Sequence, residues 1–242
     1  MKAIVYAKRN LKELLNDPLS LIFTIGLPAF LLVFIISLNK SLGLNEAFSP
    51  ENFVPSIIIF SYSFLTMFSA ILVSKDRSSS FLTRMFVTPL KPKDYIIGYM
   101  IPQFIIALIQ SIILYGLGLI VGLKFSWIIL LTIPFLLIIS LLFIGMGMLF
   151  GSLLKEQQVG PIVSIVVQVV AFLSGMWFSL DLVGGAFEVI GRILPFSHAV
   201  DLLKYILAND FTNMLISLLI LIGYILVINI LAIITFKKKM KS

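Results

Sequence analysis

The chain has 242 residues, of which 60% are hydrophobic and 12% charged, and its formal net charge is +7. Soluble domains carry about 25% charged residues, so this composition, with a mean hydropathy of +1.13, excludes a soluble domain and predicts a membrane protein. The absence of cysteine excludes disulfides, thiolate metal sites and a cysteine nucleophile. His198 is the only histidine, which excludes a metal site built from several histidines.

Residues 1–17, MKAIVYAKRNLKELLND, form a predicted amphipathic helix. Its apolar residues recur at helical spacing, and they are Ile4, Ala7, Leu11, Leu14 and Leu15. The basic residues Lys8, Arg9 and Lys12 fall elsewhere on the helix. A basic amphipathic helix ahead of a membrane span is typical of an interfacial helix. It serves either as a topology anchor or as a docking element for a partner, and Pro18 then turns the chain into the first span.

Six apolar segments are long enough to cross the membrane, since a span needs about 20 residues for roughly 30 Å of hydrocarbon. They are residues 19–38, 54–74, 95–122, 127–150, 159–179 and 211–236. None of them contains Asp, Glu, Lys, Arg or His. The predicted fold is therefore an all-α integral membrane protein, with residues 1–242 forming a single transmembrane domain.

The flanking charges predict the orientation. With six spans, both termini and the loops 75–94 and 151–158 share one side of the membrane. All of the 18 basic residues lie on that side except Lys40, Lys124, Arg192 and Lys204. Because positive charge accumulates on the cytoplasmic side, we expect a multi-pass protein of the plasma (cell) membrane with both termini in the cytoplasm.

Residues 75–94 form the largest predicted cytoplasmic element between spans. An apolar stripe recurs there at helical spacing, made of Phe81, Leu82, Met85 and Phe86. Ser78, Ser79 and Ser80 are candidate N-caps, and Pro89 and Pro92 end the predicted helix. Its aromatic anchors and arginines are typical of a protein–protein hot spot. The alternative is a positively charged loop whose apolar face lies on the membrane.

Residues 180–210 are apolar but contain several charged side chains and Pro195. Each charge costs about 2.5–3.5 kcal/mol at a bilayer centre, so a seventh span is not expected. We predict two short helices, at 185–193 and 198–208, that dip into the outer leaflet as a re-entrant segment, with Ser197 as the N-cap of the second.

The absence of charged residues from the spans argues against several functions. Secondary transporters and proton relays generally use acidic groups inside the membrane, and an intramembrane hydrolase needs a nucleophile with its base. The chain has no GxxxxGK[ST] phosphate loop, so it is not expected to bind ATP by that motif. Energy for active transport would come from a separate polypeptide acting on a cytoplasmic element.

Two stretches resemble the membrane (permease) subunits of ABC-2-type ATP-binding-cassette exporters, and the resemblance covers essentially the whole chain. The first match precedes the third span and consists of Asp76, Arg77, Arg84, Thr88, Pro89 and Leu90. Ser80 and Phe81 depart from the Gly and Thr that are frequent in the family. The second match consists of Ser174, Gly175, Leu194, Pro195, Phe196, Ser197 and Asp201. Ser179 and Gly184 stand where the family often has proline.

The resemblance implies that residues 75–94 contain a coupling helix seated in a groove of the ATPase. The implied contacts are Arg77, Phe81, Arg84, Met85, Thr88 and Pro89. The N-terminal helix, with Lys8, Arg9 and Lys12, is a second lever. An outer gate would involve Gly175, Phe178, Pro195, Phe196 and Ser197.

The resemblance also implies the assembly and the cofactors. Two permease subunits, identical or paralogous, would join two ATPase subunits. ATP and Mg would be held by the ATPase, and this chain would bind no cofactor, metal or nucleic acid and would not itself be an enzyme.

Amides at membrane depth have two readings. One interpretation is that they form hydrogen bonds between helices, worth about 0.6 kcal/mol each; this applies to Gln103, Gln110, Gln168 and Asn229. The other is that three of them line a substrate pathway, namely Gln110, Gln168 and Asn229. The apolar spans favour export of a lipophilic or amphipathic drug, lipid or peptide. The alternative function is an ATP-independent pore, a scramblase-like protein or a lipid-modifying protein.

Overall fold

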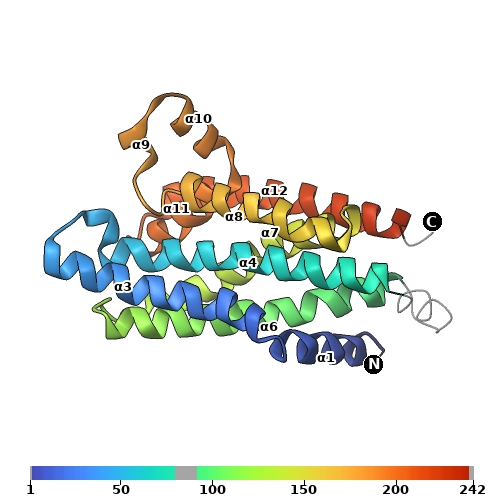
Figure 1. Cartoon of the computed structure of the whole chain (residues 1–242). Coiled ribbons are helices and arrows are strands. Elements are labelled where there is room, and N and C mark those ends of the chain that lie inside the picture. Colours follow the sequence, from blue (N-terminus) through green and yellow to red (C-terminus); the bar gives the residue numbers. More distant parts are fainter. Residues whose placement is uncertain (1, 80–91, 240–242) are drawn as a thin grey trace.

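The structure is a computed structural model that describes residues 2–79 and 92–239 (Figure 1). The part of the chain that it describes is helical, with turns and short connections and no strand. The first half contains α1 (Lys2–Leu15), α2 (Pro18–Leu21), the π-helix η1 (Ile22–Gly26), α3 (Leu27–Leu42), the 3₁₀ turn η2 (Glu46–Phe48), α4 (Pro50–Ser78) and α6 (Pro92–Ile120). The second half contains α7 (Ile128–Leu153), α8 (Glu156–Leu173), α9 (Leu180–Val183), α10 (Gly185–Ile193), α11 (Pro195–Leu207) and α12 (Phe211–Lys239).

The six predicted spans are confirmed. Six helical segments are long and apolar enough to cross a membrane, and they are Pro18–Leu42, Pro50–Ser78, Asp94–Ile120, Ile128–Leu153, Glu156–Leu173 and Phe211–Lys239. Most extend past their apolar runs, because polar and basic residues continue the last turns, as Lys75 and Arg77 do in α4. The protein is therefore a multi-pass, all-α membrane protein.

The fifth span is shorter than predicted. We expected residues 159–179, but α8 ends at Leu173. Gly175 then adopts a positive φ of 76°, a conformation that glycine reaches without steric cost. The apolar composition of residues 174–179 concealed this turn.

The first span contains a π-helical segment with an identifiable cause. The Nε2 of Gln110 on α6 donates a 2.6 Å hydrogen bond to the carbonyl of Thr24, inside η1. Pro28, four residues after Thr24, has no N–H to donate to this carbonyl, so the Gln110 amide supplies the donor that the helix ladder lacks. At its start, Asp17 caps the span by accepting hydrogen bonds from the backbone N–H of Leu19 at 3.2 Å and the hydroxyl of Ser20 at 2.6 Å.

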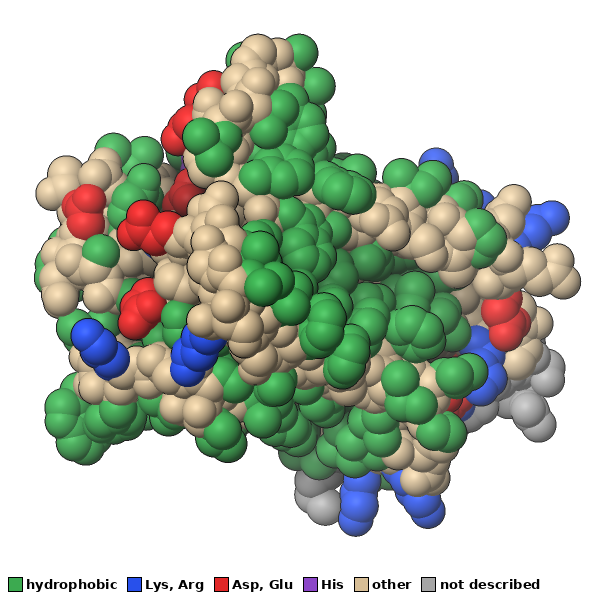
Figure 2. All heavy atoms as spheres, turned by 60° about the vertical axis from the view of Figure 1, so that its left-hand side comes forward, with side chains coloured by type: hydrophobic (Ala, Val, Ile, Leu, Met, Phe, Trp, Pro, Cys, Tyr) green, Lys and Arg blue, Asp and Glu red, His purple; other side chains and the backbone are tan. Residues whose placement is uncertain are grey.

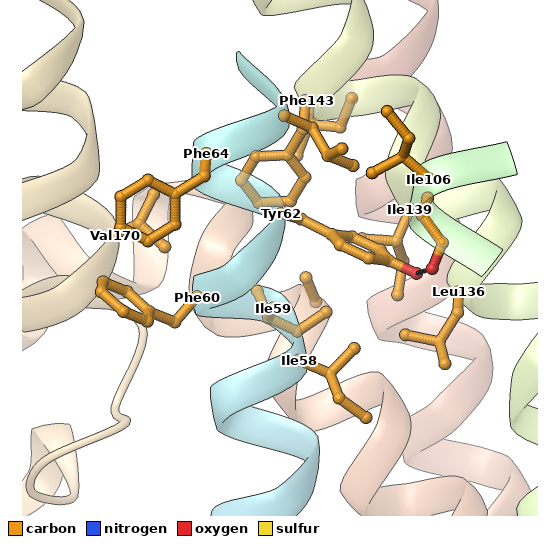
Figure 3. Close-up of a cluster of buried hydrophobic side chains, with 14 of the residues drawn as sticks. Ile58, Ile59, Phe60, Tyr62, Phe64, Ile106, Leu136, Ile139, Phe143 and Val170 are labelled. Carbon is orange, nitrogen blue, oxygen red and sulfur yellow. Dashed lines mark hydrogen bonds between the residues drawn. The ribbon is translucent and has the colours of Figure 1, made fainter. Parts of the chain in front are cut away.

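Helix α4 lies at the centre of the bundle. It packs against α3, α6, α7, α8 and α11, and every residue from Phe53 to Thr66 is buried. Figure 3 shows Phe60 and Phe64 pointing from α4 toward Val170 of α8, while Tyr62 points the opposite way, toward Ile139 and Phe143 of α7. The Tyr62 hydroxyl shares a 2.6 Å hydrogen bond with Ser111 of α6.

Glycines allow α4 and α7 to approach closely. A Cβ on Gly147 would lie 2.6 Å from the Cβ of Ser69, and one on Gly151 would lie 2.7 Å from the carbonyl of Ala70. Such contacts are too short for any side chain, so these positions require glycine. The Thr66 hydroxyl adds a 2.9 Å hydrogen bond to the carbonyl of Phe143.

The outer surface is apolar around the middle of the bundle and charged toward its ends (Figure 2). Exposed Phe30, Ile112, Ile165, Leu219 and Ile234 come from four different spans. Figure 1 places both termini at one end of the bundle, here called the termini end. Helix α4 ends at the same end of the bundle.

Helices α10 and α11 correspond to the two short helices predicted in residues 180–210, with one correction. The second helix starts at Pro195, three residues before the predicted start, because proline is well suited to the first helical position. Ser197 is therefore not an N-cap; its hydroxyl donates a 2.7 Å hydrogen bond to the carbonyl of Gly191. Helices α9 and α10 project from the side of the bundle (Figure 1).

Candidate functional site

The end of α4 and the helices around it form the first candidate site. The last turns of α4 carry Lys75, Asp76 and Arg77, and the chain then enters residues 80–91. Helix α1 packs along α6, and both meet α4 at Asp76. This site lies at the termini end, which is where the sequence predicts contact with an ATPase.

Asp76 is a buried carboxylate with three donors. Its side chain is 2% exposed. Its Oδ2 accepts hydrogen bonds from Arg9 Nη1 at 2.7 Å, from the Tyr6 hydroxyl at 2.8 Å and from the Tyr99 hydroxyl at 2.9 Å. A buried charge is tolerated only where it is paired and hydrogen-bonded, and here α1 and α6 supply the partners. Asp76 therefore joins three helices.

The sequence produces this junction through spacing. Tyr6 and Asn10 lie four residues apart on one face of α1, and Tyr95 and Tyr99 do so on α6. The ring of Tyr6 makes edge contacts with Tyr99 and Tyr95 at centroid distances of 5.3 and 5.7 Å. A Cβ on Gly98 would lie 2.2 Å from Tyr6 Cδ1, so glycine at this position admits the ring.

The buried face of α1 differs from the predicted one. Tyr6, Ala7, Asn10 and Leu14 are buried against the bundle, whereas Ile4 and Leu15 are exposed. The polar members of this face are satisfied, because Asn10 Nδ2 donates a 3.0 Å hydrogen bond to the carbonyl of Gly98. Helix α1 is thus amphipathic as predicted, but it packs on α6 through an aromatic and amide stripe.

A second chain of charges runs over the same junction. Arg9 Nη2 pairs with Glu13 Oε2 at 2.7 Å, and Glu13 Oε1 pairs with Lys75 Nζ at 2.9 Å. Burial lowers the pKa of Arg9, but its bonds to Asp76 and Glu13 outweigh burial and raise it overall. Burial, followed by the charge of Asp76, raises the pKa of the Tyr6 hydroxyl, which stays a donor.

Arg77 and Ser78 connect the same helix end to α7 and α8. Arg77 donates to the carbonyls of Gly151 at 2.9 Å, of Ser152, and of Leu154 at 3.3 Å. These are the unpaired carbonyls at the end of α7, where a cation also complements the helix dipole. The Ser78 hydroxyl donates a 2.7 Å hydrogen bond to Glu156 at the start of α8.

The other predicted residues of this site divide into two groups. Phe81, Arg84, Met85, Thr88 and Pro89 lie outside the described residues. On α1, Lys8 and Lys12 are exposed, and Arg9 binds Asp76. The predicted ATPase contacts therefore stay predictions, whereas Arg77 is engaged by the end of α7.

A lateral groove is the second candidate site. It has a volume of about 560 Å³ and lies between the first span, α4 and α8. Its lining is apolar and aromatic, and it includes Phe23, Phe60, Phe64, Phe172 and Trp177. Gln168 is exposed on this groove. Its predicted role in lining a pathway is untested.

The remaining amides form contacts within the bundle. Gln110 is buried and bonds to Thr24, as described above. Asn229 Nδ2 donates to the carbonyl of Leu141 on α7 at 3.1 Å. Gln103 is buried, and its side-chain amide has no hydrogen-bond partner among the described residues.

The predicted outer-gate residues lie on the two segments that flank α9 and α10, with Gly175 and Phe178 before α9 and Pro195, Phe196 and Ser197 after α10. Phe178 packs on Phe187 at a centroid distance of 5.7 Å. Pro195 begins α11, and the Phe196 ring lies 5.9 Å from that of Phe143 near the middle of α7. Gly175 occupies the turn after α8, and Ser197 lies near the start of α11. In the described residues, no group of three or more His, Cys, Asp or Glu side chains is arranged to hold a metal.

The sequence does not identify Asp76 as a structural centre. The predicted loop 75–94 contains this residue, whereas in the structure Asp76 is one of the buried residues of α4. The sequence carries a partial signal, because polar aromatic and amide side chains repeat at four-residue spacing, at Tyr6 and Asn10 on one helix and at Tyr95 and Tyr99 on the other. This spacing does not identify Asp76 as their partner.

Comparisons with known proteins cover both sites. Residues 2–208 match the sequence profile of the ABC-2 type transporter family. A Bacillus subtilis (strain 168) protein named "Putative transport permease YvfS" is 23% identical over 197 residues, which are 78% of this chain and 78% of that protein. The family match extends from α1 to the end of α11.

Proposed function

The chain belongs to the ABC-2 type transporter family, and from this premise we propose that it is the permease subunit of an ATP-driven exporter. Members of this family transport across a membrane and generally work with an ATPase partner. In the proposed complex, ATP and Mg are bound and hydrolysed by the separate ATPase. The termini end faces the cytoplasm of a cell bounded by this membrane.

The position of α4 carries the proposal. This helix is the central one of the bundle, and residues 80–91 follow it directly. A partner that pushes on these residues would therefore act on the helix that contacts most of the others. A peripheral span such as α12, with mostly exposed side chains, would transmit the same push to fewer neighbours.

The contacts around Asp76 extend that path. Asp76 links α4 to α1 and α6, Arg77 links it to α7, and Ser78 links it to α8. These contacts are short, and most involve a charged group, so they are among the stronger hydrogen bonds in proteins. Closure of the ATPase dimer would then displace four neighbouring helices together with α4.

The groove beside α4 supports the proposed substrate class. Its aromatic and aliphatic walls suit a lipophilic or amphipathic molecule, and Gln168 offers a single amide for orientation. The groove is open along the side of the chain. In the proposed assembly of two permeases and two ATPases, a second permease would close it.

Co-purification tests the proposal. We would express the full chain with the proteins encoded beside it and isolate it in detergent, comparing wild type with a Phe81→Ala/Arg84→Glu double variant. Lys124→Glu, an exposed charge reversal at the opposite end of the bundle, is the matched control. We expect an ATPase to co-purify with wild type and with the control, and to be lost from the double variant.

Two results would contradict the proposal. If no ATPase associates with the wild-type chain, the ATP-independent pore, scramblase-like or lipid-modifying alternative replaces it. If the double variant retains the ATPase fully, residues 80–91 are not the docking element.

A further inference from the structure

A small polar cavity lies where the end of α8 meets α9, α10 and α11. Its volume is about 130 Å³, many times the 10–15 Å³ that one water molecule requires. Its polar lining includes Ser174, Asp181, Arg192, Ser197, Asp201 and Lys204. Neither the coupling contacts nor the lateral groove uses these residues.

Some of the lining groups are already satisfied. Arg192 Nε pairs with Glu188 at 2.9 Å, and its guanidinium also pairs with Asp181. These hydrogen bonds raise the pKa of Arg192. Ser197 donates to Gly191, as described above. Arg192 and Ser197 therefore shape the wall of the cavity.

Three other lining groups have no hydrogen-bond partner among the described residues. Asp201 and Lys204 lie one turn apart on α11 and are half-buried, and within the described ranges neither forms a hydrogen bond or an ion pair within 4.0 Å. Ser174 is 2% exposed, and its hydroxyl has no hydrogen-bond partner among the described residues. Burial raises the pKa of Asp201 and lowers that of Lys204. Asp201 and Lys204 attract each other electrostatically, but buried polar groups without hydrogen bonds are costly, so together the three groups indicate a missing ligand.

The cavity lies between the middle of the bundle and the end opposite the termini. The turn before α11 is near mid-span, because the Tyr224 hydroxyl, near the middle of α12, donates a 2.6 Å hydrogen bond to the carbonyl of Ile193. From Pro195 to Lys204 the helix rises by about 13 Å, at about 1.5 Å per residue. Half of a hydrocarbon core is about 15 Å, which brings Asp201 and Lys204 near the headgroup boundary.

We propose that this cavity binds a phosphoethanolamine group. Its ammonium would bind the carboxylate of Asp201 and the hydroxyl of Ser174, and its phosphate would bind Lys204. The Cβ atoms of residues one helical turn apart lie about 5–6 Å from each other, a spacing suited to an ammonium and a phosphate joined by two carbons. The site thus recognises a zwitterion, either as a phospholipid headgroup or as a free solute.

Other ligands fit the lining less well. A divalent cation would be repelled by Lys204, and a simple anion would leave Asp201 unpaired. A phosphocholine group has no N–H donor for Asp201 and Ser174. The proposal depends on the bundle spanning a membrane, and it does not require an ATPase.

Native mass spectrometry of the purified full chain tests the site without any partner. The chain would be titrated with phosphatidylethanolamine, phosphatidylcholine and phosphatidylglycerol of identical acyl chains. Wild type is expected to bind phosphatidylethanolamine about tenfold more tightly than either other lipid. Asp201→Asn and Lys204→Gln are each expected to remove this preference, while Ser174→Ala weakens it about threefold. Glu46→Gln, an exposed acid at the same end of the bundle, is the matched control and should keep the preference.

Competition distinguishes the two sources. Free phosphoethanolamine that displaces the lipid would identify the solute as a ligand, and displacement only by a lipid would identify the headgroup. Thermal unfolding verifies that each variant is folded. If Asp201→Asn or Lys204→Gln does not fold, the binding preference of Ser174→Ala tests the site instead. The proposal is overturned if wild type shows no preference among the three lipids and does not bind free phosphoethanolamine, or if the folded Asp201 and Lys204 variants keep the preference.

Discussion

Buried charge is handled differently at the two ends of the bundle. At the termini end, Asp76 receives three hydrogen bonds from the chain itself, and Arg9, Glu13 and Lys75 form ion pairs over it. At the opposite end, Asp201 and Lys204 border a cavity, and neither has such a hydrogen bond or ion pair from the part of the chain that the structure describes. The first arrangement is a completed joint between helices, whereas the second has free binding capacity.

Under the two proposals above, this contrast separates the transmission of movement from the recognition of a ligand. To pass a displacement of residues 80–91 on to the spans, the contacts between the helices must persist while the partner pushes on those residues. A ligand site requires groups whose partners come from outside. The predictions below test whether the two ends differ in this way.

The largest expected effect is that of Asp76→Ala. It leaves Arg9, Tyr6 and Tyr99 without their shared acceptor, and breaking a buried pair in this way costs about 3–5 kcal/mol. Thermal unfolding of the purified chain measures the loss. Glu51→Ala, at the exposed start of the same helix, should cost less than about 1 kcal/mol. Equal losses in the two variants would show that Asp76 is not a structural centre.

Gly98→Ala is expected to displace α1 from α6. The new Cβ would lie 2.2 Å from the Tyr6 ring, and overpacking of this kind costs about 1–3 kcal/mol. Limited proteolysis near residues 15–18, together with thermal unfolding, reports the displacement. Gly116→Ala on the same helix is the control, because a Cβ there has nothing within 4 Å. Protection of α1 at wild-type level in Gly98→Ala would refute the tight packing of Tyr6.

Gly147→Ala should weaken the contact between α4 and α7. The added Cβ would meet the Thr66 carbonyl at 2.7 Å and Ser69 Cβ at 2.6 Å, which again costs about 1–3 kcal/mol. Gly223→Ala, on α12 with nothing within 4 Å, serves as the comparison, and the midpoint of thermal unfolding is the readout. A destabilisation as large in Gly223→Ala would show that the packing against α4 is not the cause.

The smallest expected effect is the pH dependence of stability that Asp201 causes at the end of the bundle opposite the termini. Burial raises the pKa of Asp201, so the folded state binds its proton more readily than the unfolded state does. Stability from this group is therefore lost as pH rises from the usual pKa of an aspartate through its raised value. Without ligand, the unfolding midpoint of Asp201→Asn relative to wild type should be higher at pH 7 than at pH 4.5. A difference that is the same at both pH values would mean that Asp201 is not destabilised by burial.

The spans were predictable because they depend on local composition. Each consists of a long apolar run, and α10 is bounded by Gly184 and Pro195, residues that punctuate helices. The end of α8 was not predictable, since Met176, Trp177 and Phe178 are as apolar as the span before them. For such a segment, the turn at Gly175 depends on packing against α9 and α10.

The contacts of Asp76 could not be predicted from the sequence, for a different reason. Its partners Tyr6 and Tyr99 are separated from it by 70 and 23 residues along the chain. The pairing depends on how three helices pack, and periodicity within each helix does not specify that. The same holds for Arg77, which resembles a family contact residue yet binds the carbonyls at the end of α7.

The most direct test of the account measures whether α1 and α6, which meet at Asp76 of α4, move as one unit. Because the natural chain has no cysteine, spin labels can be placed at Lys8→Cys on α1 and Ile97→Cys on α6, both exposed positions. Their distance would be measured by pulsed electron resonance in the complex with the co-purified ATPase, with and without ATP. The account predicts one unchanged, narrow distance in the wild-type background and a broadened one in Asp76→Ala. An ATP-dependent separation of α1 from α6 in the wild-type background, or an equally narrow distance in Asp76→Ala, would contradict it.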